Sequence, residues 1–200
     1  MTNDKLLEIL TKTENGYRFE GNLFLSNTQI ETLPDNLKVI GSLDLSNTPI
    51  EILPNKLMVD GNLNLSNTQI KTLPDNLKVT RNLNLSNTQI ETLPNKLTVI
   101  GDLNLSNTQI EILPDNLTVI GDLNLSNTQI ETLPNKLMVI GDLNLSNTQI
   151  TSLPDDLEVG LKTRLVGWKK HSNEALKEKQ VNQKLEKSAI KRAKKPKLAR

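Results

Sequence analysis

A unit of 20 residues repeats seven times between residues 21 and 160, and this repetition constrains the fold more than any other feature of the chain. Each copy reads close to GNLNLSNTQIETLPDNLKVI. A fixed period of this length is typical of solenoids, in which each unit rests its apolar face on its neighbours and no unit is stable alone. The sequence therefore predicts a β-rich solenoid of seven stacked rungs.

The apolar positions show how one rung folds. Across the junction of the second and third copies, Leu57, Val59, Leu63 and Leu65 alternate with polar residues, so their side chains should point to one side of an extended segment. The Ser-Asn-Thr segment that follows favours a turn, because short polar side chains bond to nearby backbone groups. Leu-Pro then begins the non-strand segment that leads the chain back to the next rung, called the return path below. Proline does not favour a central strand at this position, since it lacks the N–H donor.

One repeat shows a motif known from other proteins: Leu43-x-Leu45-x-x-Thr48-x-Ile50-x-x-Leu53-Pro54. This motif resembles the leucine-rich repeat LxLxxNxLxxLP, and its short period is similar to that of the bacterial effector subtype. The resemblance covers residues 21–160 and implies a curved solenoid that binds its ligand on a parallel sheet. Two features depart from the family: threonine replaces the ladder asparagine, and Leu-x-Val-x-Gly replaces a second Leu-Pro.

The segments that flank the repeats should protect the ends of the solenoid, because an open stack exposes strand edges. Residues 1–20 are expected to form an N-terminal cap, with a short helix over Lys5–Leu10 and half a rung over Tyr17–Glu20. Residues 161–168 contain the only tryptophan, Trp168, and are expected to cover the last rung.

Residues 169–200 form a basic tail, and the charge of the chain is divided accordingly. The repeats at 21–160 hold 7 basic and 16 acidic side chains, whereas residues 161–200 hold 14 basic and 3 acidic ones, so their net charges are −9 and +11. Apolar residues recur every four positions from Val181 to Ala193, which predicts a lysine-rich helix within 173–195.

The tail has three candidate roles besides that of a solvated segment resting on the acidic solenoid. It could bind nucleic acid, bind an anionic membrane, or act as a nuclear import signal. Nucleic-acid binding would be non-specific, because no aromatic residue follows Trp168 to stack on bases. The candidate nucleic-acid-binding residues are Lys191, Arg192, Lys194, Lys195 and Lys197.

The outward positions of the strands form polar columns, which we predict to be the surface that contacts a partner. Three stacked aspartates in these columns should repel one another, and a cation, a basic partner or the tail could compensate for their charge. A flat column offers no loop to enclose a metal ion, so no metal site is expected. The candidate residues of this sheet face are Asn62, Asn64, Asn82, Asn84, Asp102, Asn104, Asp122, Asn124, Asp142 and Asn144.

A second candidate surface is an apolar stripe of Ile100, Ile120 and Ile140, with Met138 beside it. The register of the leucine-rich repeat family would bury these isoleucines, whereas strand alternation turns them outward. We favour the outward orientation, because polar residues occupy the same column in other copies. Asp60 and Arg81, which both interrupt the repeat pattern, are expected to form an ion pair across adjacent rungs.

The composition argues against catalysis. The chain has no cysteine, which excludes disulfides and thiolate chemistry, so the cysteine-dependent ubiquitin ligase activity of some effector relatives is not carried over. Its single histidine, His171, lies outside the repeats, so a Ser-His-Asp site has no support. We expect a non-enzymatic scaffold that binds a protein, without a cofactor or small-molecule substrate. The alternative is a rigid spacer whose basic tail binds nucleic acid.

The first residues of the chain predict neither a signal peptide nor a membrane span, since charged side chains interrupt a short apolar cluster. The cytoplasm is therefore the expected compartment. Export as an effector by a specialised route and import into the nucleus both stay open at this point.

Overall fold

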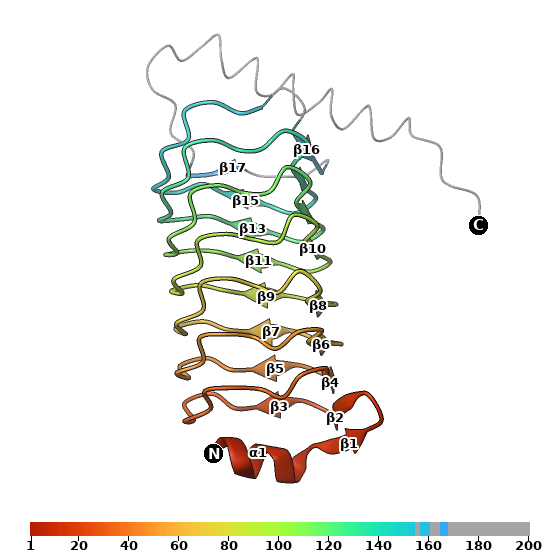
Figure 1. Cartoon of the computed structure of the whole chain (residues 1–200). Helices are drawn as coiled ribbons and strands as arrows, with labels where there is room; N and C mark the ends of the chain where they lie inside the picture. Colours follow the sequence, from red (N-terminus) through yellow and green to blue (C-terminus); the bar gives the residue numbers. More distant parts are fainter. Residues whose placement is uncertain (155–156, 161–164, 168–200) are drawn as a thin grey trace, which may run out of the picture.

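The computed structural model describes residues 1–154, 157–160 and 165–167. These residues form a parallel β-solenoid in which successive rungs stack along one axis, from the N-terminal helix at one end to β17 at the other (Figure 1). Paired strands are 20 residues apart, as in the pairing of Leu63 with Leu83. The predicted solenoid with a parallel sheet is thus confirmed. The tryptophan, the tail and its predicted helix lie outside the described residues.

Each of the seven copies contributes two short strands, one directly after the bend at its start and one directly before the bend that begins the next copy. The strands before the bend are β4 (Leu37–Ile40), β6 (Met58–Val59), β8 (Lys78–Val79), β10 (Thr98–Val99), β12 (Thr118–Val119), β14 (Met138–Val139) and β16 (Glu158–Val159). The strands after the bend are β3 (Leu23–Phe24), β5 (Leu43–Asp44), β7 (Leu63–Asn64), β9 (Leu83–Asn84), β11 (Leu103–Asn104), β13 (Leu123–Asn124), β15 (Leu143–Asn144) and β17 (Leu165–Val166).

The strands after the bend form one continuous sheet of eight strands, whereas those before it fall into two sheets. One of these two contains β4, β6 and β8 together with two strands from the N-terminal segment, β1 (Thr11–Thr13) and β2 (Gly16–Glu20), and the other contains β10, β12, β14 and β16. The ladder is interrupted between β8 and β10. The pairing of β15 with β17 is offset by 22 residues rather than 20, since Leu143 aligns with Leu165.

The N-terminal cap covers the first rung. Helix α1 spans Asn3–Ile9 and buries Leu6, and Leu10 is buried immediately after it. Strands β1 (Thr11–Thr13) and β2 (Gly16–Glu20) form an antiparallel hairpin, and β2 pairs in parallel with β4, with Tyr17 opposite Leu37. The cap therefore occupies the sheet edge that the first repeat would otherwise expose.

The core consists of aliphatic side chains that repeat in columns. Leu57, Val59, Leu63 and Leu65 are all fully or almost fully buried, as their alternation predicts. Burial of this kind supplies most of the favourable free energy of folding, at about 25 cal/mol per Å² of apolar surface. The segment is not one strand, however, because the chain bends between β6 and β7 without turning any of the four side chains out of the core.

The Ser-Asn-Thr segments form a second corner of each rung. There, side-chain hydroxyl groups donate hydrogen bonds to backbone carbonyl oxygens. The buried hydroxyl of Thr108 donates to the carbonyl oxygen of Leu105 at 2.7 Å, and the other described copies repeat this bond. Asn107 adopts a left-handed conformation with φ of 56°. Asparagine tolerates this conformation better than most residues, which explains its place at the corner.

Glycine occupies the bend because the backbone of the preceding rung lies directly against it. A side-chain carbon on Gly121 would lie 2.6 Å from the carbonyl carbon of Gly101, well inside van der Waals contact. One rung departs from this rule and carries Arg81, and the interrupted ladder lies between this rung and the next. Leu77 in the same rung is only half-buried, whereas the equivalent Leu117 is fully buried. The side chain at the bend thus coincides with looser stacking.

Candidate binding surfaces

The column that contains the three aspartates bridges neighbouring rungs. Asp102 Oδ1 accepts a hydrogen bond of 2.9 Å from the N–H of Asp122, and Asp122 Oδ1 accepts one of 2.7 Å from the N–H of Asp142. Asn62 and Asn82 accept the equivalent bonds from the following rungs at 3.2 and 2.9 Å. Hydrogen bonds to a charged acceptor are stronger than neutral ones. Backbone donors therefore offset part of the repulsion between the stacked carboxylates.

The neighbouring column of asparagines has a structural role of its own. Asn104 Oδ1 accepts a hydrogen bond of 3.0 Å from the N–H of Ser106, and the same contact recurs along the column. The other members that make this contact are Asn64, Asn84, Asn124 and Asn144. Their Nδ2 groups donate no hydrogen bond to any residue that the structure describes. The sheet face thus presents a half-buried row of amide donors one rung apart.

The isoleucine stripe faces outward, as strand alternation predicts. Ile100, Ile120 and Ile140 are 57%, 39% and 41% exposed, whereas the valine before each of them is fully buried. The N–H of Ile120 donates to Val99 and that of Ile140 to Val119, at 3.0 and 3.1 Å, so the three isoleucines stay in register on successive rungs. Met138 is half-buried in β14, two residues before Ile140. The register of the resembled family is therefore wrong for this column.

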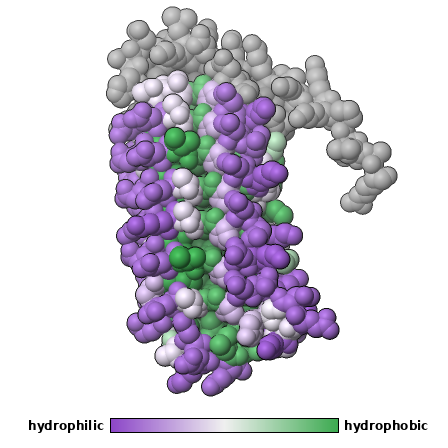
Figure 2. Space-filling model, viewed as in Figure 1, coloured by the Kyte–Doolittle hydropathy of each residue, from purple (hydrophilic) through white to green (hydrophobic). Residues whose placement is uncertain are grey.

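Two further isoleucines, Ile52 and Ile112, are each 75% exposed on the return path of their rungs and were missed by the sequence analysis. Their column holds threonine in most other copies, so the change from Glu-Thr-Leu to Glu-Ile-Leu could have revealed them. A space-filling view shows an apolar strip along the solenoid axis between two hydrophilic columns (Figure 2). The solenoid therefore exposes apolar surface on more than one side.

The predicted ion pair between Asp60 and Arg81 is wrong. Asp60 instead pairs with Lys38, one rung in the other direction, at 3.3 Å between Oδ2 and Nζ. Arg81 makes no ion pair with the residues described. In the sequence, Asp60 has a cation one rung away on each side, Lys38 before it and Arg81 after it. In the structure, Lys38 lies on the outer face of β4 within reach of Asp60 and is its partner.

The chain matches no protein-family model, and a search of curated proteins also finds no match. Among the described residues, no group of three or more acidic or histidine side chains is arranged to hold a metal ion. No helix within the described ranges has the length and apolar character needed to cross a membrane. What the structure defines is a class of protein, a β-solenoid with parallel strands on both sides of the bend in each rung.

Proposed function

We propose that this chain is a non-enzymatic repeat scaffold that binds a protein partner through the outward faces of its strands. The observation that carries this proposal is the stripe of Ile100, Ile120 and Ile140, exposed in register on three successive rungs. Single exposed apolar residues are ordinary on protein surfaces, whereas contiguous ones are typical of interaction sites. The stripe directly follows β10, β12 and β14, and backbone hydrogen bonds from Ile120 and Ile140 to the preceding rungs hold it in register, so a partner would not have to order it on binding.

The polar columns support the same proposal. The free Nδ2 donors of the asparagine column are spaced by one rung and can bond to the acceptors of an adjoining chain. Interfaces commonly combine an apolar centre with polar contacts at the rim. Within this proposal the chain is grouped with leucine-rich repeat proteins, which it resembles in motif and in presenting a parallel sheet.

The proposal predicts that replacing Ile120 with lysine removes partner binding while leaving the fold intact. Ile120 is already partly exposed, so the new charge should stay in water and cost little stability. The measurement is affinity capture of interacting proteins with the full chain, followed by determination of Kd for each purified candidate. A Kd at least about tenfold weaker in the variant is expected for a residue at the centre of the interface.

The matched control is Ile112→Lys, which places the same charge at an exposed isoleucine outside the stripe. A true partner of the stripe binds the wild type and the Ile112 variant but not the Ile120 variant. Partners that bind all three proteins equally would contradict the role of the stripe. Loss of binding in both variants would show that the added positive charge itself weakens partner binding, wherever it is placed on the surface.

The alternative proposal assigns the function to the basic tail, with the solenoid as a spacer. It rests on the net charge of +11 in residues 161–200 against −9 in the repeats. Replacing Lys191, Arg192, Lys194, Lys195 and Lys197 with glutamine should then weaken binding to duplex DNA. It should also reduce the slope of log K against log salt concentration by up to about 4.5, since each phosphate contact contributes about 0.9. An unchanged slope would exclude these five residues as the phosphate contacts.

A further inference from the structure

A groove lies at the N-terminal end of the solenoid, on the outer face of the strands before the bend. It has a volume of about 510 Å³, and its lining comes from the β1–β2 hairpin and the first rungs. This volume falls within the range of about 300–1,000 Å³ that is typical of sites for small ligands. The groove does not belong to any surface that the sequence analysis proposed.

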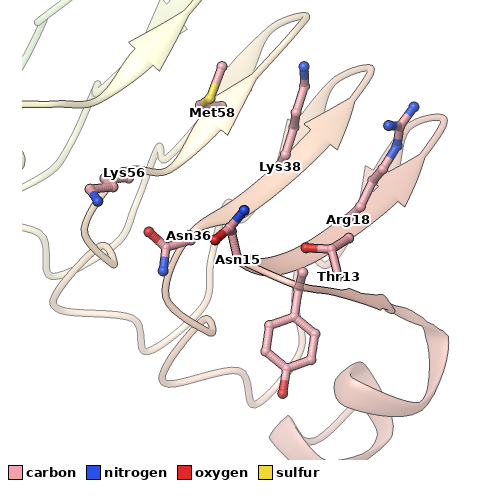
Figure 3. A pocket seen from close by; sticks show the side chains of 8 residues that line it. Thr13, Asn15, Arg18, Asn36, Lys38, Lys56 and Met58 are labelled. Atoms are coloured by element: carbon pink, nitrogen blue, oxygen red, sulfur yellow. The ribbon is translucent and has the colours of Figure 1, made fainter.

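The lining of the groove is rich in hydrogen-bond donors and contains no carboxylate among the described residues. Arg18 on β2 and Lys38 on β4 extend side by side from neighbouring strands, whereas the side chain of Lys56, on the turn before β6, points away from both of them (Figure 3). The amides of Asn15 and Asn36 lie on the same side of the groove as Lys56 (Figure 3). Three cations and two amides thus line the groove, with Arg18 and Lys38 as the two that extend together, although the repeats as a whole are acidic.

The charges of the groove are only partly neutralised by the protein itself. Arg18 pairs with Glu20 at 2.9 Å and Lys38 pairs with Asp60 at 3.3 Å. All four side chains are at least about one-third exposed, and such pairs contribute little net free energy, so a ligand can compete with them. Lys56 has no carboxylate partner in the described part of the chain.

The backbone fixes the cations at the separation of paired strands. Arg18 and Lys38 are directly paired positions of β2 and β4, so they stand about 4.8 Å apart along the solenoid axis. The turn at Lys56 is fastened to the next rung, because its N–H donates to Asn76 Oδ1 at 2.8 Å. A ligand with two or three negative groups at similar spacing can therefore contact several cations at once.

We propose that this groove binds the phosphate groups of a small polyanion such as a linear polyphosphate or a nucleoside triphosphate. Arginine and lysine are the side chains that most often hold phosphate, arginine through its planar fork and lysine as a point charge. Closely spaced phosphates match cations held one rung apart better than a single anion does. Met58 offers an apolar contact at the end of the row for the remainder of the ligand.

The test uses the full chain labelled with ¹⁵N, titrated with inorganic tripolyphosphate and followed by NMR. The amide resonances of Asn15, Arg18, Asn36 and Lys38 are expected to shift with a saturable dependence on concentration. In the double variant Arg18→Gln, Lys38→Gln, the Kd should rise at least about tenfold, because two charge-assisted contacts are lost. The matched control is Lys96→Gln, a lysine at the repeat position of Lys56 but outside the groove, and it should bind as the wild type does.

Two further ligands, ATP and citrate, identify which class of polyanion the groove binds. ATP distinguishes a nucleotide from free polyphosphate: tighter binding than tripolyphosphate favours the nucleotide, and equal binding favours the polyphosphate chain. Citrate tests the choice of phosphate over carboxylate, and binding as tight as that of tripolyphosphate would overturn this assignment. Shifts confined to residues 169–200, or an unchanged Kd in the double variant, would overturn the groove as the site. None of these results depends on the isoleucine stripe, so they are independent of the proposed protein binding.

Discussion

Replacing Ile110 with alanine should lower the free energy of unfolding by about 2–5 kcal/mol, the usual cost of a cavity in a well-packed core. Ile110 is completely buried in the middle of the stack. In a solenoid each rung contacts only its neighbours, so this loss weakens two interfaces at once. The measurement is urea-induced unfolding of the full chain, followed by circular dichroism.

The control for this experiment lies two residues further along. Ile112→Ala makes the same chemical change at a side chain that is 75% exposed, and it should alter the free energy of unfolding by less than about 0.5 kcal/mol. Equal effects of the two substitutions would mean that the apolar column containing Ile110 does not form the core described above.

Replacing Gly121 with alanine should destabilise the solenoid by about 1–3 kcal/mol, the typical cost of overpacking. The added carbon would approach the carbonyl carbon of Gly101 to 2.6 Å and would contact Asp102 Oδ1. This oxygen accepts the hydrogen bond from the N–H of Asp122, so relief of the clash also disturbs the column that bridges the rungs. Thermal and denaturant unfolding of the full chain both measure the effect.

Arg81→Ala is the matched control, since the chain already carries a side chain at this position of the repeat. It removes the charge but keeps the first side-chain carbon, and it should change stability by less than about 0.5 kcal/mol. If alanine at Gly121 were as harmless as alanine at residue 81, close approach of the backbones could not be the reason for glycine at the bend.

The buried side of each rung could be predicted because it depends on local alternation. Leu57, Val59, Leu63 and Leu65 keep their side in the structure, and the polar residues in the column of Ile120 indicated its exposure. The bend between the two strands of a rung could not be predicted in the same way. A corner that leaves every side chain on its original side does not change the alternation in the sequence.

The roles of the polar columns were beyond prediction for a different reason. The bonds of Asp102 and Asn82 join atoms 20 residues apart, and they exist only once the rungs are stacked in register. The basic groove depends on the same stacking, because Arg18, Lys38 and Lys56 come from the cap and from separate copies. Composition indicates an acidic solenoid and gives no sign of a local cluster of cations.

The interruption between β8 and β10 affects only one side of the solenoid, since β9 and β11 remain paired across the same two rungs. The two rungs are therefore joined by strand pairing on one side of the solenoid, whereas on the other side strand pairing is absent and the N–H of Gly101 donates to the carbonyl oxygen of Arg81 at 3.3 Å. The groove lies before this interruption and the isoleucine stripe after it, on the same side of the solenoid. The groove and the stripe are therefore flanked by two separate sheets, and strand pairing on this side does not run continuously from one surface to the other.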